Sequence, residues 1–327
     1  MPEVVVITGA SAGVGRATAR RFAEEGAHVA LLARGRDGLE AAARDVEAAG
    51  GRALALPTDV ADADAVEAAS IRVEEELGPI DVWVNNAMAT LYAPVAQTSP
   101  EEFRRATDVT YLGSVWGTMS ALRRMAPRDR GTIVQVGSAL AYRGIPLQAA
   151  YCGAKHALQG FLDSLRVELL HDGSGVRVTM VQLPALNTLQ FTWARTTMPR
   201  KPQPVPPIFQ PELAADAIHW AARNPRRELY VGWSTVKAIV GDKAASGVAD
   251  RYLARAGYEG QQTEEAVEPD RRDNLFEPVP GEHGARGPFN GRARSGSVQF
   301  WASRHREWLG LAVGASTTAA VLAFRRR

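Results

Sequence analysis

A tyrosine and a lysine four residues apart, Tyr151 and Lys155, are the residues whose types and spacing most directly indicate chemistry. On a helix, such residues lie one turn apart on the same face. An ammonium group beside a phenol favours the phenolate, so we expect Lys155 to lower the pKa of Tyr151 from its ordinary value of about 10. The pair then predicts a group that donates and accepts protons near neutral pH. A solvent-exposed tyrosine and lysine on a helix surface is the alternative, because this spacing alone is common.

Ser138 is the next candidate, since it follows the apolar run 132–136, which is typical of a buried strand. Its hydroxyl can hydrogen-bond the oxygen of a carbonyl or alcohol substrate. A serine hydrolase is disfavoured, because the sequence around Ser138 lacks the second glycine of a Gly-x-Ser-x-Gly elbow. Cys152 has no obvious base nearby and is interpreted as a packed side chain. The six histidines show no metal-ligand spacing, so no metal site is predicted.

Strand-like runs alternate with helical patterns from Val4 to Gly232. This alternation predicts a doubly wound, mostly parallel (Rossmann-like) α/β sheet of about seven strands, with helices on both faces and a C-terminal extension. Several polar residues follow strand ends, at the edge where open α/β sheets bind ligands. The expected strands are 4–7, 28–32, 52–56, 82–84, 132–136, 176–181 and 228–231, and the expected helices include 61–77, 100–125 and 149–170.

The first expected strand leads directly into Thr8-Gly-Ala-Ser-Ala-Gly-Val-Gly15 and then into a helical pattern. Glycines permit a tight turn and a close approach of the backbone to a ligand, while the helix N-terminus faces a pyrophosphate. A strand, a glycine turn and a helix in this order predict a dinucleotide-binding site.

The end of the second expected strand indicates which dinucleotide is favoured. An NAD site places an acidic side chain there to bind the ribose hydroxyls. This sequence has Ala33 followed by Arg34, with Arg16 in the helix after the glycines. A guanidinium matches a 2′-phosphate in charge and geometry. We therefore expect NADP(H) rather than NAD(H), and the alternative is that Arg34 is a solvated loop residue.

In order and spacing, Thr8-Gly-x-x-x-Gly-x-Gly15, Asn85-Asn-Ala87, Ser138 and Tyr151-x-x-x-Lys155 resemble the short-chain dehydrogenase/reductase family, over about Val4 to Gly232. The glycine spacing is similar to that of the compact branch, here of NADP type, rather than the sugar-nucleotide epimerases. The resemblance implies that Tyr151 is the general acid/base, that Lys155 lowers its pKa and holds the nicotinamide ribose, and that Ser138 orients the substrate oxygen. The cofactor-binding residues expected from the motifs and the resemblance are Gly9, Ser11, Gly13, Val14, Gly15, Arg34, Asp59, Val60, Asn86, Ala87, Tyr151, Lys155, Pro184 and Thr188.

Three positions depart from the family's pattern. Met88 stands where a glycine usually follows Asn-Asn-Ala, and the segment 184–188 replaces a Pro-Gly opening. Thr110 stands where the family has a fourth catalytic residue, an asparagine whose backbone carbonyl binds a water that links the lysine to solvent. Because a backbone group binds that water, threonine can preserve the relay if the helix geometry is kept.

Composition limits the class of protein and its partners. An apolar content of 46% indicates a globular protein with a core, and a net charge of +2 gives no reason to propose nucleic acid as a partner. The single cysteine excludes an intramolecular disulfide, and the N-terminus has no signal-peptide features, so we expect a cytoplasmic protein. A homodimer or homotetramer is also expected, with part of the helix 149–170 at the subunit interface.

Residues 1–259 are expected to form the dinucleotide-binding domain, and the tail differs from it in composition. The segment 260–298 is rich in Glu, Pro, Gly and Arg, which predicts a disordered linker. An apolar helix is expected within 299–327. Its apolar part, 308–324, would reach only ~26 Å, against a bilayer core of about 30 Å. Membrane attachment and packing on the protein or on a partner are equal alternatives.

The sequence thus predicts an NADP(H)-dependent oxidoreductase that interconverts a carbonyl and an alcohol on a small, hydrophobic substrate. The proline-rich segment 189–211, which carries several aromatic residues, is expected to cover that substrate, although an ordinary surface loop is the alternative. The rival from another class is a nucleotide-sensing or scaffold protein that keeps the cradle with little or no turnover.

Overall fold

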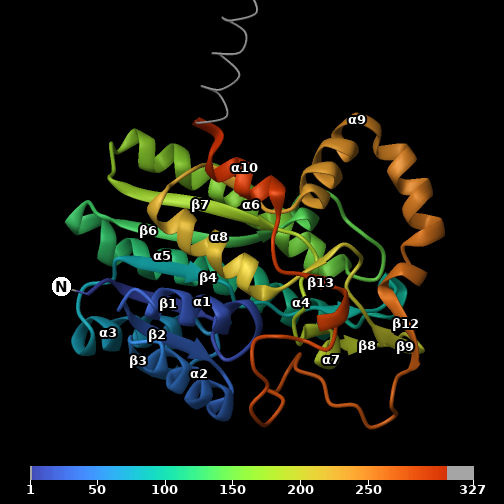
Figure 1. Cartoon of the computed structure of the whole chain (residues 1–327), viewed down its shortest axis with the longest axis horizontal. Coiled ribbons are helices and arrows are strands. Elements are labelled where there is room, and N and C mark those ends of the chain that lie inside the picture. The colour runs from blue at the N-terminus through green and yellow to red at the C-terminus, as the bar shows by residue number, and fades with distance from the viewer. Residues whose placement is uncertain (1, 308–327) are drawn as a thin grey trace, which may run out of the picture.

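A seven-stranded parallel sheet forms the centre of the computed structural model, which describes residues 2–307 (Figure 1). The strand order is β11-β7-β6-β4-β1-β2-β3, and every neighbouring pair runs parallel. The predicted Rossmann-like sheet is therefore confirmed, and its topological switch point, where such sheets bind ligands, lies between β1 and β4. The strands are β1 (Val4–Thr8), β2 (His28–Ala33), β3 (Arg52–Pro57), β4 (Val82–Asn85), β6 (Gly131–Ser138), β7 (Val176–Leu183) and β11 (Glu228–Tyr230).

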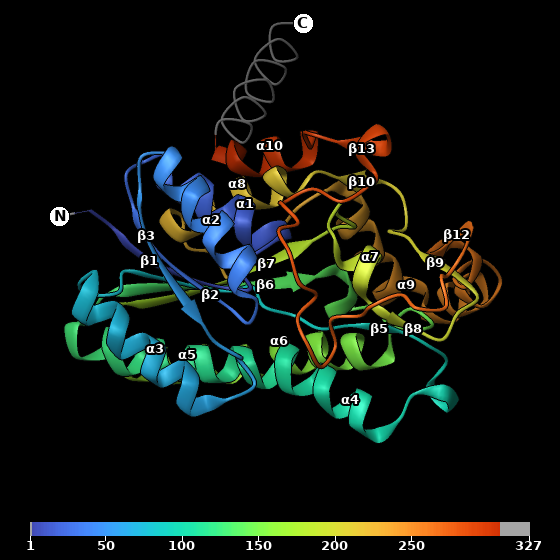
Figure 2. The ribbon, with the colours of Figure 1, turned by 90° about the horizontal axis from the view of Figure 1, so that it is seen from below.

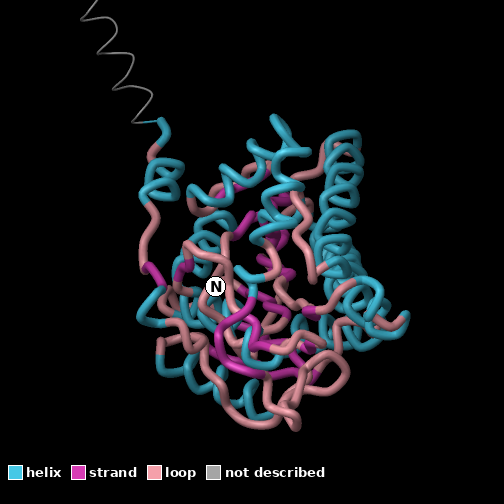
Figure 3. Tube along the Cα trace, turned by 90° about the vertical axis from the view of Figure 1, so that its right-hand side faces the viewer, coloured by secondary structure: helices cyan, strands magenta, loops and turns pink. Residues whose placement is uncertain are grey.

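Helices cover both faces of the sheet, as Figure 2 shows, and Figure 3 shows strands running through the middle of the molecule. Successive strand residues point to opposite faces, so Val5 and Ile7 of β1 enter one core while Val4 and Val6 enter the other. The sheet is thereby buried on both sides, which explains its nearly continuous apolar strands. One face carries α1 (Gly13–Ala23), α2 (Arg36–Ala48) and α8 (Pro211–Arg223), and the other carries α3 (Ala63–Glu76), α4 (Pro100–Thr107), α5 (Gly113–Met125) and α6 (Ala149–His171).

The helix expected over 100–125 is interrupted. It begins at a capping box made by Ser99 and Glu102, and the α4 segment then passes through a π-helical turn at Asp108–Leu112 before α5. A π turn widens the helix locally, and such turns are frequent at functional sites. The stretch 100–125 is therefore helical throughout, as expected, but its α-helical geometry gives way to a π turn at the position of Thr110.

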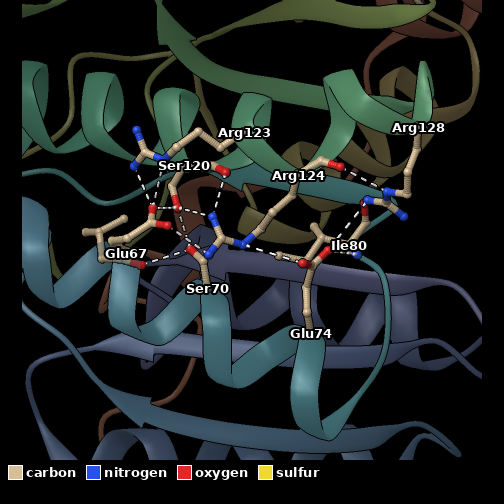
Figure 4. Close-up of polar contacts among 9 residues, drawn as sticks. Glu67, Ser70, Glu74, Ile80, Ser120, Arg123, Arg124 and Arg128 are labelled. Carbon is tan, nitrogen blue, oxygen red and sulfur yellow. Dashed lines mark hydrogen bonds and ion pairs between the residues drawn. The ribbon is translucent and has the colours of Figure 1, made fainter.

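An ion-pair network holds α5 against α3 (Figure 4). Glu67 of α3 accepts hydrogen bonds from the Ser120 hydroxyl at 2.6 Å, Arg123 Nη2 at 2.5 Å and Arg124 Nη2 at 2.9 Å. Although burial raises the pKa of Glu67, these hydrogen bonds outweigh it and lower the pKa to about 2. The network therefore stabilises the fold above the ordinary glutamate pKa, and this contribution is lost as the pH falls from about 4.5 towards 2.

Three small two-stranded ladders lie beside the main sheet. Two of them fix both ends of the segment 267–289, which is called the strap below. Figure 2 shows the strap, in orange to red, running from β12 past α7 (Gln190–Trp193) and α2 towards β13. The ladders are β5 (Leu91–Tyr92) with β8 (Arg195–Thr196), β9 (Arg200–Pro202) with β12 (Gln262–Ala266), and β10 (Ile208–Phe209) with β13 (Ala293–Arg294).

The composition of residues 260–298 predicts a disordered linker, whereas the structure gives this segment defined contacts. Leu275 of the strap is fully buried in the core on the α4–α5 side. Asn187, also fully buried, accepts the Gly287 amide on its carbonyl at 3.0 Å and the Phe289 amide on its side chain at 2.9 Å. A polar segment with few apolar residues cannot form a core of its own, but it can be held by hydrogen bonds to a surface that is already folded.

The helix α9 (Trp233–Ala256) follows the sheet and α10 (Val298–Arg304) follows the strap. Within residues 2–307, every helix is either too short or too polar to span a lipid bilayer. The apolar segment 308–324, on which membrane attachment was expected to depend, lies outside the described residues. Short 3₁₀ turns occur at Val95–Gln97, Ala126–Arg128, Ala139–Ala141, Glu259–Gln261 and Asn290–Arg292.

Candidate active site

The glycine turn between β1 and α1 forms a cradle that excludes side chains. Gly9 and Gly13 have φ angles of +66° and +59°, a region that L side chains rarely adopt. A Cβ at Gly15 would lie 2.2 Å from the Gly9 carbonyl oxygen. Asn86, at the end of β4, donates through Nδ2 to the Thr8 and Gly9 carbonyls at 2.9 and 3.2 Å, which holds the turn to the neighbouring strand. These features fit the close approach of a dinucleotide to the backbone.

A cleft opens above this cradle at the carboxyl ends of the strands. Gly15 packs against the Gly9 carbonyl and does not line the cleft, and Pro184 does not line it either. Tyr151 and Lys155, which are also expected to bind the cofactor, do not line it either. The remaining expected cofactor-binding residues do line it: Gly9, Ser11, Gly13, Val14, Arg34, Asp59, Val60, Asn86, Ala87 and Thr188.

Several residues that are not expected from the sequence also line the cleft. Met88 follows the β4 strand end, so its position could have indicated it. The strap residues could not have been found in this way, because a segment of biased composition gives no signal of where it packs. From the strap, the cleft is lined by Asn274, Pro278, Val279, Gly281 and His283.

Arg34 lines the end of the cleft where a 2′-phosphate is expected, whereas Arg16 is buried and does not line the cleft. Arg34 donates to the backbone carbonyls of Phe276 and Asn274, both at 2.5 Å. Arg16 donates to Asp45 at 2.7 Å and forms an ion pair with Glu282 of the strap. Arg34 is therefore not a free loop residue in this structure, because protein oxygen atoms occupy its guanidinium.

Ser138, Tyr151 and Lys155 lie together at the sheet edge that also carries the glycine turn. Ser138 ends β6 and Tyr151 lies in the first turn of α6, with the Ser138 side chain close enough to the phenol to lower its pKa. Lys155 Nζ lies 5.5 Å from the centroid of the Tyr151 ring and donates to the Val136 carbonyl at 2.8 Å. The structure thus brings the predicted trio together, and the individual roles remain predictions.

The expected effect of Lys155 on Tyr151 does not appear in this structure. Burial raises the pKa of Tyr151, and the hydrogen bond from Ser138 lowers it only in part. Burial also lowers the pKa of Lys155 to about 7, so its charge is lost as the pH rises through neutrality. Desolvation is therefore the main cause of both shifts. In this state Tyr151 is protonated at neutral pH.

Thr110 is fully buried in the π turn and contacts Ala89, in the segment that follows β4. Its hydroxyl accepts a hydrogen bond from the Ala89 amide and donates one to the Ala89 carbonyl, both at 2.9 Å. The Thr110 carbonyl accepts the Ser114 hydroxyl at 3.2 Å. Thr110 therefore positions the segment that follows Asn86 and Ala87. The helix geometry at Thr110 is altered, and its role in a proton relay stays a prediction.

Comparison with known proteins identifies the family. A family model described as short chain dehydrogenase matches residues 3–198. That match covers more than half of the chain.

The chain belongs to the short-chain dehydrogenase family.

Members of this family were found among curated proteins and solved structures. An uncharacterized oxidoreductase, YxnA of Bacillus subtilis strain 168, is 32% identical over 92% of this chain and 85% of its own length. A fatty acyl-CoA reductase of Acinetobacter baylyi is 30% identical over 69% of this chain and 75% of its own. The structure of an alcohol dehydrogenase from Thermococcus sibiricus, complexed with 5-hydroxy-NADP, has a TM-score of 0.62 and 28% identity, and the match covers 71% of this chain and 96% of that one.

Proposed function

We propose that this short-chain dehydrogenase is an NADP(H)-dependent oxidoreductase that interconverts a carbonyl and an alcohol on a small, hydrophobic substrate. The observation that carries the proposal is the placement of Ser138, Tyr151 and Lys155 at the same sheet edge as the glycine cradle. A proton-transfer group and a dinucleotide cradle at one edge are the two parts that a hydride-transfer reaction needs.

The chain's own residues supply the proton and the orientation. When bound, the nicotinamide ring supplies or accepts the hydride. In the direction of reduction, Tyr151 donates its phenolic proton to the substrate oxygen, and the Ser138 hydroxyl hydrogen-bonds that same oxygen. Lys155 holds the ribose and, when protonated, places a positive charge beside the phenol. In the direction of oxidation, Tyr151 accepts the proton as a phenolate, and its raised pKa makes the phenolate a minor form at neutral pH.

The preference for NADP(H) rests on the charges at the adenosine end of the cleft. Arg105 donates to Asp59 at 2.6 Å, and Arg105 lies close enough to Arg34 that, together with burial, it lowers the pKa of the Arg34 guanidinium. Two neighbouring guanidinium groups favour a dianion such as a 2′-phosphate. The 5-hydroxy-NADP complex of the Thermococcus alcohol dehydrogenase agrees with this choice.

Aromatic side chains beside Tyr151 support a hydrophobic substrate. Tyr92 is fully buried, and its pKa is raised by burial and by the nearby Tyr151. Its ring centroid lies 6.2 Å from that of Phe191, which lies 5.9 Å from that of Phe289 in the strap. The fatty acyl-CoA reductase among the relatives acts on a substrate with an apolar chain, which agrees with this proposal.

The test of the function is a panel of aldehydes and ketones of increasing apolar chain length, assayed with NADPH and with NADH at the nicotinamide absorbance. We expect turnover with NADPH and a higher kcat/KM for longer apolar substrates. Tight NADPH binding without turnover of any carbonyl would instead support the sensor or scaffold alternative.

Replacing Arg34 by methionine should weaken the binding of NADPH but not of NADH. A hydrogen bond to a charged group is worth about 1.5–3 kcal/mol, so the Kd for NADPH should rise about 10- to 150-fold. Titration of each cofactor by fluorescence gives the two constants. The matched control is Arg36→Met, an exposed arginine at the start of α2, which should change neither. Tighter binding of NADH than of NADPH to the wild-type chain would contradict the cofactor preference.

We also propose that the chain forms a homodimer or homotetramer in the cytoplasm and contacts a membrane through its C-terminal tail. The exposed apolar side chains Val167 and Leu170 on α6 support the first statement. Sedimentation of the full-length chain, with and without lipid vesicles, tests both. A monomeric chain would contradict the first statement, and the absence of vesicle binding would contradict the second.

A further inference from the structure

The strap lies over the cleft and presents oxygen atoms to groups that a dinucleotide would use. The Gly13 amide, part of the glycine cradle, donates to the Gly284 carbonyl at 3.2 Å. Arg34 donates to the carbonyls of Asn274 and Phe276 at 2.5 Å. A backbone amide of the cradle and an arginine at the adenosine end are thus both bound to one segment of the same chain.

A carboxylate of the strap completes this set of acceptors. Arg16, which is buried, forms an ion pair with Glu282. The dinucleotide phosphates are likewise anionic oxygen groups that bind cradle amides and guanidinium groups. The strap therefore offers the cleft the same kinds of acceptor, one negative charge included, as the phosphates of NADP(H).

The ends and the middle of the strap are held in different ways. Its ends are held by the β12–β9 and β13–β10 ladders. Its middle is held by the buried side chain of Leu275 and by the acceptors described above. Gly281 and Gly284 have φ angles of +102° and +75°, so the turn over the cradle depends on conformations that L side chains rarely adopt.

We propose that the strap is a tethered competitor of the cofactor, which must leave the Gly13 amide, Arg16 and Arg34 before the phosphates of NADP(H) can bind there. The inference rests on the proposed function and adds a regulation of the same site. The apparent Kd for the cofactor equals the intrinsic Kd divided by the fraction of molecules whose strap is open. A change that loosens the strap without removing a group that binds the cofactor therefore tightens cofactor binding.

Two substitutions in the full-length chain loosen the strap without altering the cradle. Glu282→Gln removes the charge that pairs with Arg16, and Gly284→Ala disfavours the turn that reaches Gly13. The matched control is Glu264→Gln, which removes an exposed carboxylate on β12 outside the strap. We expect the Kd for NADP⁺, measured by calorimetry, to fall about 3- to 10-fold in the two variants and to stay within about 2-fold in the control.

Hydrogen exchange of the wild-type chain tests the movement directly. Saturating NADP⁺ should speed the exchange of peptides within 267–289 while it protects the glycine turn. Unchanged or weaker NADP⁺ binding by both loosened variants, or slower exchange of the strap on binding, would overturn the inference while leaving the proposed function in place. If neither the wild-type chain nor any variant binds NADP⁺ or NAD⁺, the proposed function fails and the inference fails with it.

Discussion

Replacing Tyr151 by phenylalanine should lower kcat about 1,000-fold while leaving the Kd for NADPH within about 3-fold. The substitution removes only the phenolic hydroxyl, and proton transfer by a positioned side chain contributes about 10²- to 10⁴-fold to a rate. The ring and its packing on α6 are kept, so the cofactor site stays intact. The kcat is measured with the carbonyl found to be the best substrate, and the Kd is measured by fluorescence titration.

Tyr252→Phe makes the same chemical change at an exposed tyrosine of α9 and serves as the matched control, with kcat expected to be unchanged. A Tyr151→Phe variant that keeps more than about a tenth of the wild-type kcat would exclude Tyr151 as the proton donor. Equal losses of kcat and of NADPH binding would show instead that the substitution disturbs the cleft.

Replacing Gly15 by alanine should abolish tight dinucleotide binding, with a rise in Kd of about 100-fold or more. The new Cβ would lie 2.2 Å from the Gly9 carbonyl oxygen and 2.6 Å from Asn86 Nδ2. The backbone of the glycine turn, or the hydrogen bonds between Asn86 and the turn, must therefore shift. Such overpacking costs about 1–3 kcal/mol of stability. Calorimetric titration with NADP⁺ and NAD⁺, together with thermal unfolding, measures the two effects.

The matched control is Gly160→Ala in α6, where an added Cβ meets no atom within 4 Å. Because alanine is favoured over glycine in a helix, this control should be as stable as the wild-type chain or more stable by about 0.5–1 kcal/mol. Dinucleotide binding by Gly15→Ala with the wild-type Kd would show that the turn is not the phosphate cradle.

The central sheet could be predicted because its signals are local. Apolar runs such as 132–136 and 176–181 need both faces covered, and parallel strands meet that need by alternating with helices. The strand ends then place Ser138 and Asn86 at one edge, whatever the details of the loops. The proximity of Tyr151 and Lys155 follows from helical spacing alone. In all these cases the residues that interact are close in the sequence or share one sheet edge.

The sequence alone, through local periodicity and strand ends, thus determined the central sheet and the proximity of Ser138, Tyr151 and Lys155. Tertiary structure decided the environment of those groups. Burial in the folded chain raises the pKa of Tyr151, whereas the spacing to Lys155 predicts a lowered pKa, and packing against Ala89 accompanies the π turn at Thr110. The position of the strap was decided in the same way, because its contacts join residues such as Arg34 and Phe276 that lie far apart in the sequence. Desolvation and long-range hydrogen bonds depend on what the rest of the chain places nearby, so no local pattern can report them.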